Sequence, residues 1–158
     1  MPTKHELKSI LVAIPLFKNL DPDEIDALLK PMSLLAFKAG EALLVEGTPS
    51  ERLIVLIAGK VAVIKGDGES ASHICDLDAG ECVGEIGVLE NAPCSANVKA
   101  VSDVEAASIS REDLERFFSS NRLAAIKILR QVVTVLAGRL RRTNVSYSSL
   151  MRIADDMG

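Results

Sequence analysis

The sequence predicts a mainly β domain of the jelly-roll or small-barrel class, flanked by helices and followed by a long C-terminal helix. Eight of the ten glycines fall between Gly40 and Gly87, where they separate short runs rich in leucine and β-branched residues. Evenly spaced short strands of this kind are typical of jelly rolls and small barrels. Apolar residues then recur with a heptad spacing from Ile126 to Leu150, which predicts one long helix.

Composition limits the classes of function. The 158 residues are 48% apolar, which suits one compact core over 1–120 and one extra helical element over 121–158. A net charge of −4 and the lack of tryptophan argue against a nucleic-acid surface. No apolar run has membrane-spanning length, and the mixed N-terminus does not resemble a signal peptide. Three cysteines without CxxC spacing predict neither disulfides nor a zinc site, so we expect a cytoplasmic protein with reduced thiols.

The helices that flank the β region have recognisable start signals. After an N-terminal helix, the segment 20–29 begins with Asp21 as N-cap, Pro22 at the first helical position and Glu24 three residues after the cap. Ser110 can cap the next helix, and Asn121 can cap the last helix, which we expect to run to about Leu150.

The β region divides into runs that each end at a turn residue. Gly-Asp-Gly at 66–68 predicts a hairpin turn, because these residues tolerate positive φ. With the segments that follow, roughly eight strands are expected. The runs are SLLAFKAG (33–40), EALLVEG (41–47), RLIVLIAG (52–59), KVAVIKGDG (60–68), SHICDLDAG (72–80), ANVKAV (96–101) and EAASIS (105–110).

The last helix carries an apolar stripe with alternating steps of three and four residues, formed by Ile126, Leu129, Val133, Leu136, Leu140, Thr143, Tyr147 and Leu150. One interpretation is a helix packed on its own β domain, which fits the first half, where Ile128, Val132 and Val135 widen the apolar face. Beyond Gly138 the stripe is narrow and flanked by arginines. A seam with a second copy of the chain is favoured there.

The segment GECVGEIGVLENAPCSANVKA (80–100) predicts a one-turn helix between two strands. Free N–H groups at the start of such a turn favour an anion, and Gly84 allows close approach to the backbone. Glu85 offers acceptors for hydroxyl groups and Ser95 offers a donor, so the segment suits a ligand with a phosphate and a sugar hydroxyl. The alternative is a bulged loop with a solvated glutamate.

The segment also resembles the phosphate-binding cassette of the cyclic-nucleotide-binding domains of the cAMP-receptor family. The segments at 14–29, 37–63 and 101–118 are similar to the entry segment, first strands and return strand of that family, so the resemblance covers nearly the whole chain. It implies a double-stranded β-helix, or β-roll, with cAMP or cGMP as candidate ligand.

The family's functional residues can be carried over by position. Glu85 matches the ribose-binding glutamate, Gly84 and Ile86 match the backbone near the ligand, and Ser95 matches the phosphate-binding hydroxyl. The family's phosphate-binding arginine is replaced by Cys94. The residues that contact the base across a dimer in bacterial members would be Thr143 and Asn144.

The missing arginine predicts weak binding, because each charge-assisted hydrogen bond contributes about 1.5–3 kcal/mol. Lys60, Lys65 or Lys99 could supply a substitute charge. Cys94 can be read as a small residue filling the lost side chain's space or as a redox-sensing thiol. The other two cysteines, Cys75 and Cys82, are expected in the core.

The sequence therefore predicts a non-catalytic regulatory module that binds a cyclic nucleotide and signals to an unidentified partner protein through its C-terminal helix, as a homodimer. The alternative is a degenerate domain of the same fold that binds no nucleotide and serves for protein interaction. A metalloenzyme is disfavoured because His73 is the one histidine of the β region. Binding to DNA is not expected, since only eight residues follow Leu150.

Overall fold

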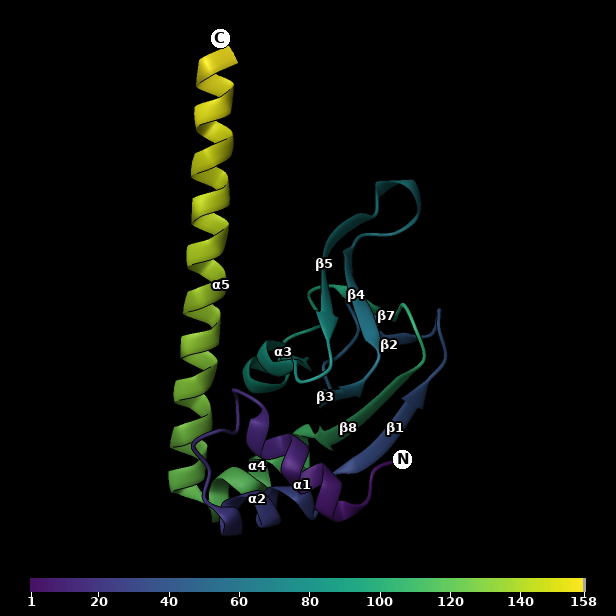
Figure 1. The fold of residues 1–158 in the computed structure, drawn as a ribbon, viewed down its shortest axis with the longest axis vertical. Coiled ribbons are helices and arrows are strands. Elements are labelled where there is room, and N and C mark those ends of the chain that lie inside the picture. Colours follow the sequence, from purple (N-terminus) through teal and green to yellow (C-terminus); the bar gives the residue numbers. More distant parts are fainter. Residues whose placement is uncertain (158) are drawn as a thin grey trace.

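Two four-stranded antiparallel sheets form the body of the molecule (Figure 1). The computed structural model describes residues 1–157, except for the side chain of Thr143. The first sheet has the order β1-β8-β3-β6 and the second the order β2-β7-β4-β5, which confirms the predicted β-roll. The strands are β1 Ser33–Phe37, β2 Ala42–Leu44, β3 Arg52–Ala58, β4 Lys60–Lys65, β5 Ser72–Asp78, β6 Cys82–Val83, β7 Asn97–Ala100 and β8 Val104–Ser110.

The first sheet is buried on both faces, and β3 shows why its sequence is a continuous apolar run. Side chains alternate across a strand. Ile54 and Leu56 pack in the core cluster between the two sheets, with Val61 and Val98 of the second sheet. Leu53 and Val55 pack on the other face in a second cluster made mostly by the helices.

Three short helices cover that outer face together with the base of the long helix (Figure 1). They are α1 Lys4–Ala13, α2 Pro22–Leu29 and α4 Arg111–Ser120. The predicted caps at Asp21 and Ser110 are confirmed, whereas the side-chain amide of Asn121 donates to the Phe117 carbonyl oxygen at 3.2 Å. The Asp21 N–H donates to Glu24 Oε1 at 2.8 Å, and the Asp113 N–H donates to Ser110 Oγ at 3.1 Å.

The last helix, α5, spans Arg122–Met157 and is 36 residues long, so it continues beyond the predicted end near Leu150. Its first half packs on the body through Ala124, Ile128 and Val132, which are all buried. Its second half projects away from the sheets (Figure 1). Within residues 1–157, no helix combines the length and the apolar character needed to cross a membrane.

The predicted hairpin at 66–68 is present, since β4 and β5 pair as antiparallel neighbours and Gly66 and Gly68 have positive φ. Its connection also holds a 3-10 helix at Gly68–Ser70. Of the two cysteines expected in the core, Cys82 is half-buried and packs against the helix-side core cluster, whereas Cys75 is exposed, so that expectation is wrong. The reason for Cys75 is topological: β5 is the edge strand of its sheet, and almost all of its side chains are exposed.

Candidate functional site

The predicted one-turn helix is present as α3, Glu85–Glu90, between β6 and β7. Close contacts require glycine both at its N-cap, Gly84, and within it, at Gly87. Gly84 has φ +83°, and an added Cβ would lie 2.7 Å from the Arg52 carbonyl oxygen. A Cβ on Gly87 would overlap Ser50 Oγ. The segment is therefore pressed against the loop before β3, and Glu85 is held at a defined place.

Five of the seven predicted site residues line one cavity. Gly84, Glu85, Ile86, Cys94 and Ser95 surround a hollow of ≈ 550 Å³ that is partly open to solvent. Aliphatic side chains from both sheets complete the wall, namely Leu44, Val63, Leu77, Val83 and Val98.

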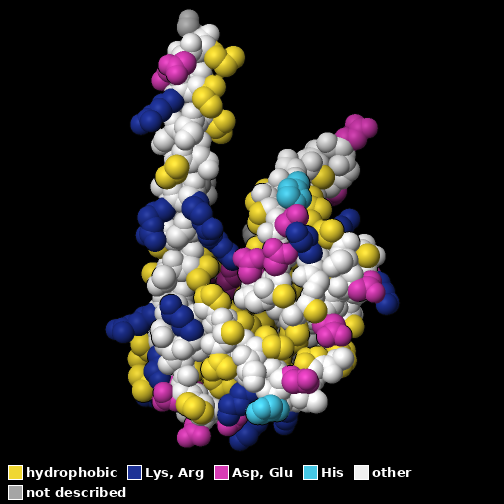
Figure 2. Space-filling model, in the orientation of Figure 1, with side chains coloured by type: hydrophobic (Ala, Val, Ile, Leu, Met, Phe, Trp, Pro, Cys, Tyr) yellow, Lys and Arg dark blue, Asp and Glu magenta, His cyan; other side chains and the backbone are white. Residues whose placement is uncertain are grey.

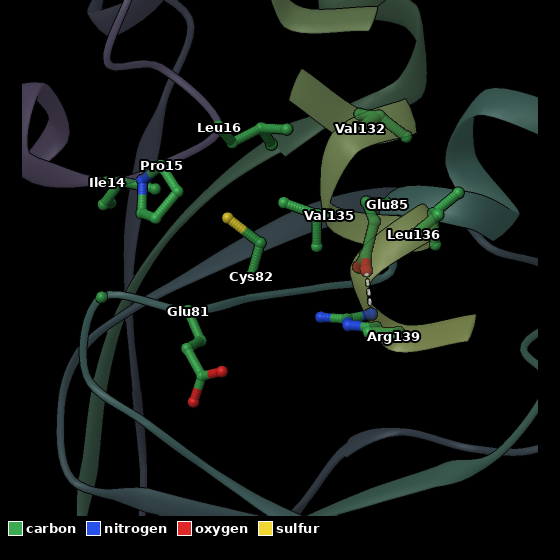
Figure 3. Close-up of a pocket in the computed structure, with 11 residues that line it drawn as sticks. Ile14, Pro15, Leu16, Glu81, Cys82, Glu85, Val132, Val135, Leu136 and Arg139 are labelled. Carbon is green, nitrogen blue, oxygen red and sulfur yellow. Dashed lines mark hydrogen bonds and ion pairs between the residues drawn. The ribbon is translucent and has the colours of Figure 1, made fainter. Parts of the chain in front are cut away.

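Glu85 is joined to the long helix by an ion pair. Its Oε1 accepts a hydrogen bond from Arg139 Nη1 of α5 at 2.7 Å (Figure 3). The Glu85 side chain is 11% exposed and that of Arg139 39% exposed. In the sequence, Arg139 is only one of the arginines that flank the helical stripe beyond Gly138. No local pattern could reveal the pair, because its members lie 54 residues apart.

The Cys94 thiol lies beside two hydroxyl groups. Cys94 is 7% exposed, and its Sγ lies 3.4 Å from Ser50 Oγ and 3.9 Å from Thr48 Oγ1. Its backbone N–H donates to the Thr48 carbonyl at 2.8 Å. The thiol is therefore closely packed, and both interpretations of Cys94 stay predictions.

None of the three lysines considered as substitutes belongs to the described residues that line the cavity. Lys60 pairs with Asp78 at 3.5 Å. Lys65 pairs with Glu46 at 2.8 Å and donates to the Ser95 carbonyl oxygen at 2.6 Å, so it fastens the end of the cassette through the backbone. Lys99 is exposed on β7.

The two candidates on α5 are not brought to the cavity. Asn144 is exposed on the projecting half of the helix and is not among the residues lining the hollow. The side chain of Thr143 lies outside what the structure describes. Their proposed contact with a base across a dimer stays a prediction.

A second hollow of ≈ 490 Å³ shares Cys82, Glu85 and Arg139 with the first (Figure 3). Its other walls come from the segment 14–16 and from α5, through Val132, Val135 and Leu136. Burial, with a smaller contribution from the Glu85 carboxylate, raises the pKa of the Cys82 thiol to about 12. Among the described residues, no group of three or more His, Cys, Asp or Glu side chains could hold a metal ion.

Comparison with known proteins agrees with this geometry. The family model described as cyclic nucleotide-binding domain matches residues 34–121. The CRP-like cAMP-activated global transcriptional regulator of Mycobacterium tuberculosis is 27% identical over 146 residues. The alignment covers 92% of this chain and 63% of the regulator, so the chain spans less than two thirds of that relative.

Solved structures give the same result. A cyclic nucleotide-binding domain from Methylobacillus flagellatus has a TM-score of 0.77 at 27% identity, covering 88% of this chain and 79% of that one. The regulatory subunit of a cAMP-independent protein kinase A from Trypanosoma cruzi, bound to guanosine, has a TM-score of 0.70 at 26% identity, covering 81% and 45%. A family model that matches more than half of the chain, on a fold shared with these structures, leads to one conclusion: the chain belongs to the cyclic nucleotide-binding domain family.

Proposed function

We propose that the chain is a non-catalytic regulatory module that binds a nucleotide-type ligand in the cavity beside α3 and signals to a partner protein through α5. The single observation that carries this proposal is the Glu85–Arg139 ion pair at 2.7 Å. It connects the residue expected to bind a ribose hydroxyl with the helix expected to report binding.

The coupling follows from competition for one carboxylate. A ribose hydroxyl that donates to Glu85 changes the hydrogen bonding available to Arg139, and Arg139 is fixed on α5. If a ligand binds more tightly when the Glu85–Arg139 pair is intact than when it is broken, or the reverse, its binding shifts the balance between two positions of α5. A partner that contacts α5 would sense that shift.

The identity of the ligand is not given by the family. One relative is described as cAMP-activated, and another as a cAMP-independent kinase subunit bound to guanosine. Because Cys94 occupies the place of the phosphate-binding arginine, we expect cAMP and cGMP to bind only weakly, with dissociation constants on the order of tens of micromolar or higher.

Calorimetric titration with cAMP and cGMP tests the proposal on three proteins. The natural chain should bind weakly, and Cys94→Arg should bind at least about tenfold more tightly, since one good ionic contact is worth about 1.4 kcal/mol or more. Glu85→Ala in the Cys94→Arg background should weaken binding again. Tight binding of cAMP by the natural chain would contradict the assigned role of Cys94.

A second candidate function rests on the same substitution. With a buried thiol at Cys94 and Glu85 already engaged by Arg139, the domain could serve only as an interaction module. Absence of any nucleotide or nucleoside binding, including to Cys94→Arg, would favour this second function.

We further propose that the active form is a homodimer formed through α5. Side chains of the predicted stripe are exposed along the helix, among them Val133 at 66%, Leu140 at 61% and Tyr147 at 63%. Figure 2 shows hydrophobic and basic side chains along the part of α5 that projects from the body. A second copy of the same stripe would bury these side chains in a two-stranded coiled coil.

A further inference from the structure

The cavity beside α3 has no net charge to offer a ligand. Among the described residues that line it, Glu85 and Arg139 are the two with charged side chains, and they neutralise each other across 2.7 Å. Because Glu85 is nearly buried, separating this pair would leave a carboxylate with little water around it. Such a carboxylate is costly to leave unpaired.

The remaining polar side chains that line the cavity carry no charge. Ser50 and Cys94 are 2% and 7% exposed and lie side by side, with 3.4 Å between Oγ and Sγ. Ser95 adds a hydroxyl at the rim. Hydroxyl and thiol groups can donate to and accept from a neutral hydroxymethyl group. They cannot neutralise the full negative charge of a cyclic phosphate.

A cyclic nucleotide therefore meets an unfavourable choice. If Arg139 stays on Glu85, the phosphate is desolvated without a counter-charge. If Arg139 turns to the phosphate, Glu85 loses its partner. A ligand without charge avoids both costs, because a carboxylate has about four acceptor positions and can accept from ribose hydroxyls while it remains paired with arginine.

We infer that the cavity prefers an uncharged ribonucleoside, a base on an unphosphorylated ribose, over the corresponding cyclic nucleotide. The ribose hydroxyls would bind at Glu85 and the 5′-hydroxyl beside Ser50, Cys94 and Ser95. The base would lie against the aliphatic wall of Leu44, Val63, Leu77 and Val98. This inference rests on the proposed ligand-binding function and names the ligand class of the same site.

Calorimetry on the natural chain with adenosine, guanosine, cAMP and cGMP is the primary test. Each nucleoside should bind at least about tenfold more tightly than its cyclic nucleotide. The nucleoside affinity should be almost unchanged between about 50 and 500 mM salt, since a neutral ligand forms no screened ion pair. 2′-Deoxyadenosine should bind more weakly than adenosine, because Glu85 loses a donor.

Two variants separate charge from size at the critical position. Cys94→Arg should reverse the preference in favour of the cyclic nucleotides, whereas Cys94→Gln, which is long but uncharged, should not. Circular dichroism checks that both variants fold, and if either does not, the comparison on the natural chain decides alone.

The outcomes distinguish this inference from the proposed function. If the natural chain binds cAMP as well as adenosine or better, the nucleoside preference is wrong and the ligand-binding function stands. The same holds if adenosine fails to bind while Cys94→Arg binds cAMP. If no nucleoside or cyclic nucleotide binds either protein, the ligand-binding function itself is wrong.

Discussion

Gly87 is a residue at which packing at the cassette can be tested directly. A Cβ there would overlap Ser50 Oγ, whereas a Cβ on Gly138 of α5 would meet nothing within 4 Å. Gly87→Ala should therefore destabilise the protein by about 1–3 kcal/mol through overpacking. Gly138→Ala should stabilise it by about 0.5–1 kcal/mol, because alanine favours a helix interior. Urea denaturation measures both, and equal effects of the two substitutions would contradict the packing described for α3.

The Glu85–Arg139 pair should be visible as a coupling energy. Arg139→Met should lower the free energy of unfolding by about 1.5–3 kcal/mol in the natural background, because it leaves a nearly buried carboxylate without this partner. In a Glu85→Gln background the same change should cost clearly less. A double-mutant cycle from denaturation data measures the difference, and additive effects would show that the two side chains do not interact in solution.

The three thiols should differ in reactivity. Only the thiolate is nucleophilic, and with a pKa of about 12 for Cys82 its thiolate fraction at pH 8 is on the order of one in ten thousand. Cys94 is buried, whereas Cys75 is exposed. Iodoacetamide should therefore label the native protein first at Cys75, and Cys75→Ser should remove this fast phase. Mass spectrometry of digested protein locates the label, and early modification of Cys82 would contradict its burial.

At the scale of the elements, a second ion pair fastens the base of α5 to α2. Lys127 Nζ lies 2.6 Å from Glu24 Oε1, and both side chains are mostly buried, at 22% and 14% exposure. Burial raises the pKa of Glu24, but the hydrogen bond from the Asp21 N–H and the interaction with Lys127 outweigh it, so the pKa lies below its ordinary 4.5. The hydrogen bond with Glu24 raises the pKa of Lys127 above its ordinary 10.5.

These shifts predict the pH range in which the pair stabilises the fold. The contribution of Glu24 is fully present above about pH 4.5 and is lost as the pH falls through its lowered pKa. That of Lys127 is present below about pH 10.5 and is lost as the pH rises through its raised pKa. Thermal melts of the natural chain and Lys127→Met should thus differ most between these limits and converge in acid. A constant difference down to pH 2 would contradict the assignment.

The elements also show what the sequence could and could not predict. The strands, the caps at Asp21 and Ser110, and the short helix after Gly84 were predictable because each depends on neighbours within a few residues. The position of β5 at a sheet edge depends on strand order, so the exposure of Cys75 was not predictable. The Glu85–Arg139 pair joins a loop segment to a distant helix and required the tertiary structure.

At the scale of the whole molecule, the dimer proposed through α5 can be tested with matched substitutions. Val133 and Leu140 lie seven residues apart on the exposed stripe, at 66% and 61% exposure. Val145 is equally exposed, at 67%, but lies five residues beyond Leu140, which places it on a different face of the helix, because residues three, four or seven apart share a face. Val145 therefore differs from Val133 and Leu140 in the face of α5 on which it lies, and not in its exposure.

Light scattering at micromolar concentration should give about twice the chain mass of 16.9 kDa for the natural chain. The double variant Val133→Asp/Leu140→Asp should give the monomer mass. At each of the two positions, the aspartate of one copy would face the same aspartate of the other copy, and the two negative charges would repel each other. Val145→Asp should remain a dimer, since its side chain lies off the seam. A monomer mass for the natural chain would contradict the proposed dimer. Loss of the dimer in Val145→Asp would place the contact between the two copies on another face of α5. The signal that passes from Glu85 to Arg139 would then have to reach the partner protein by a different face of the helix.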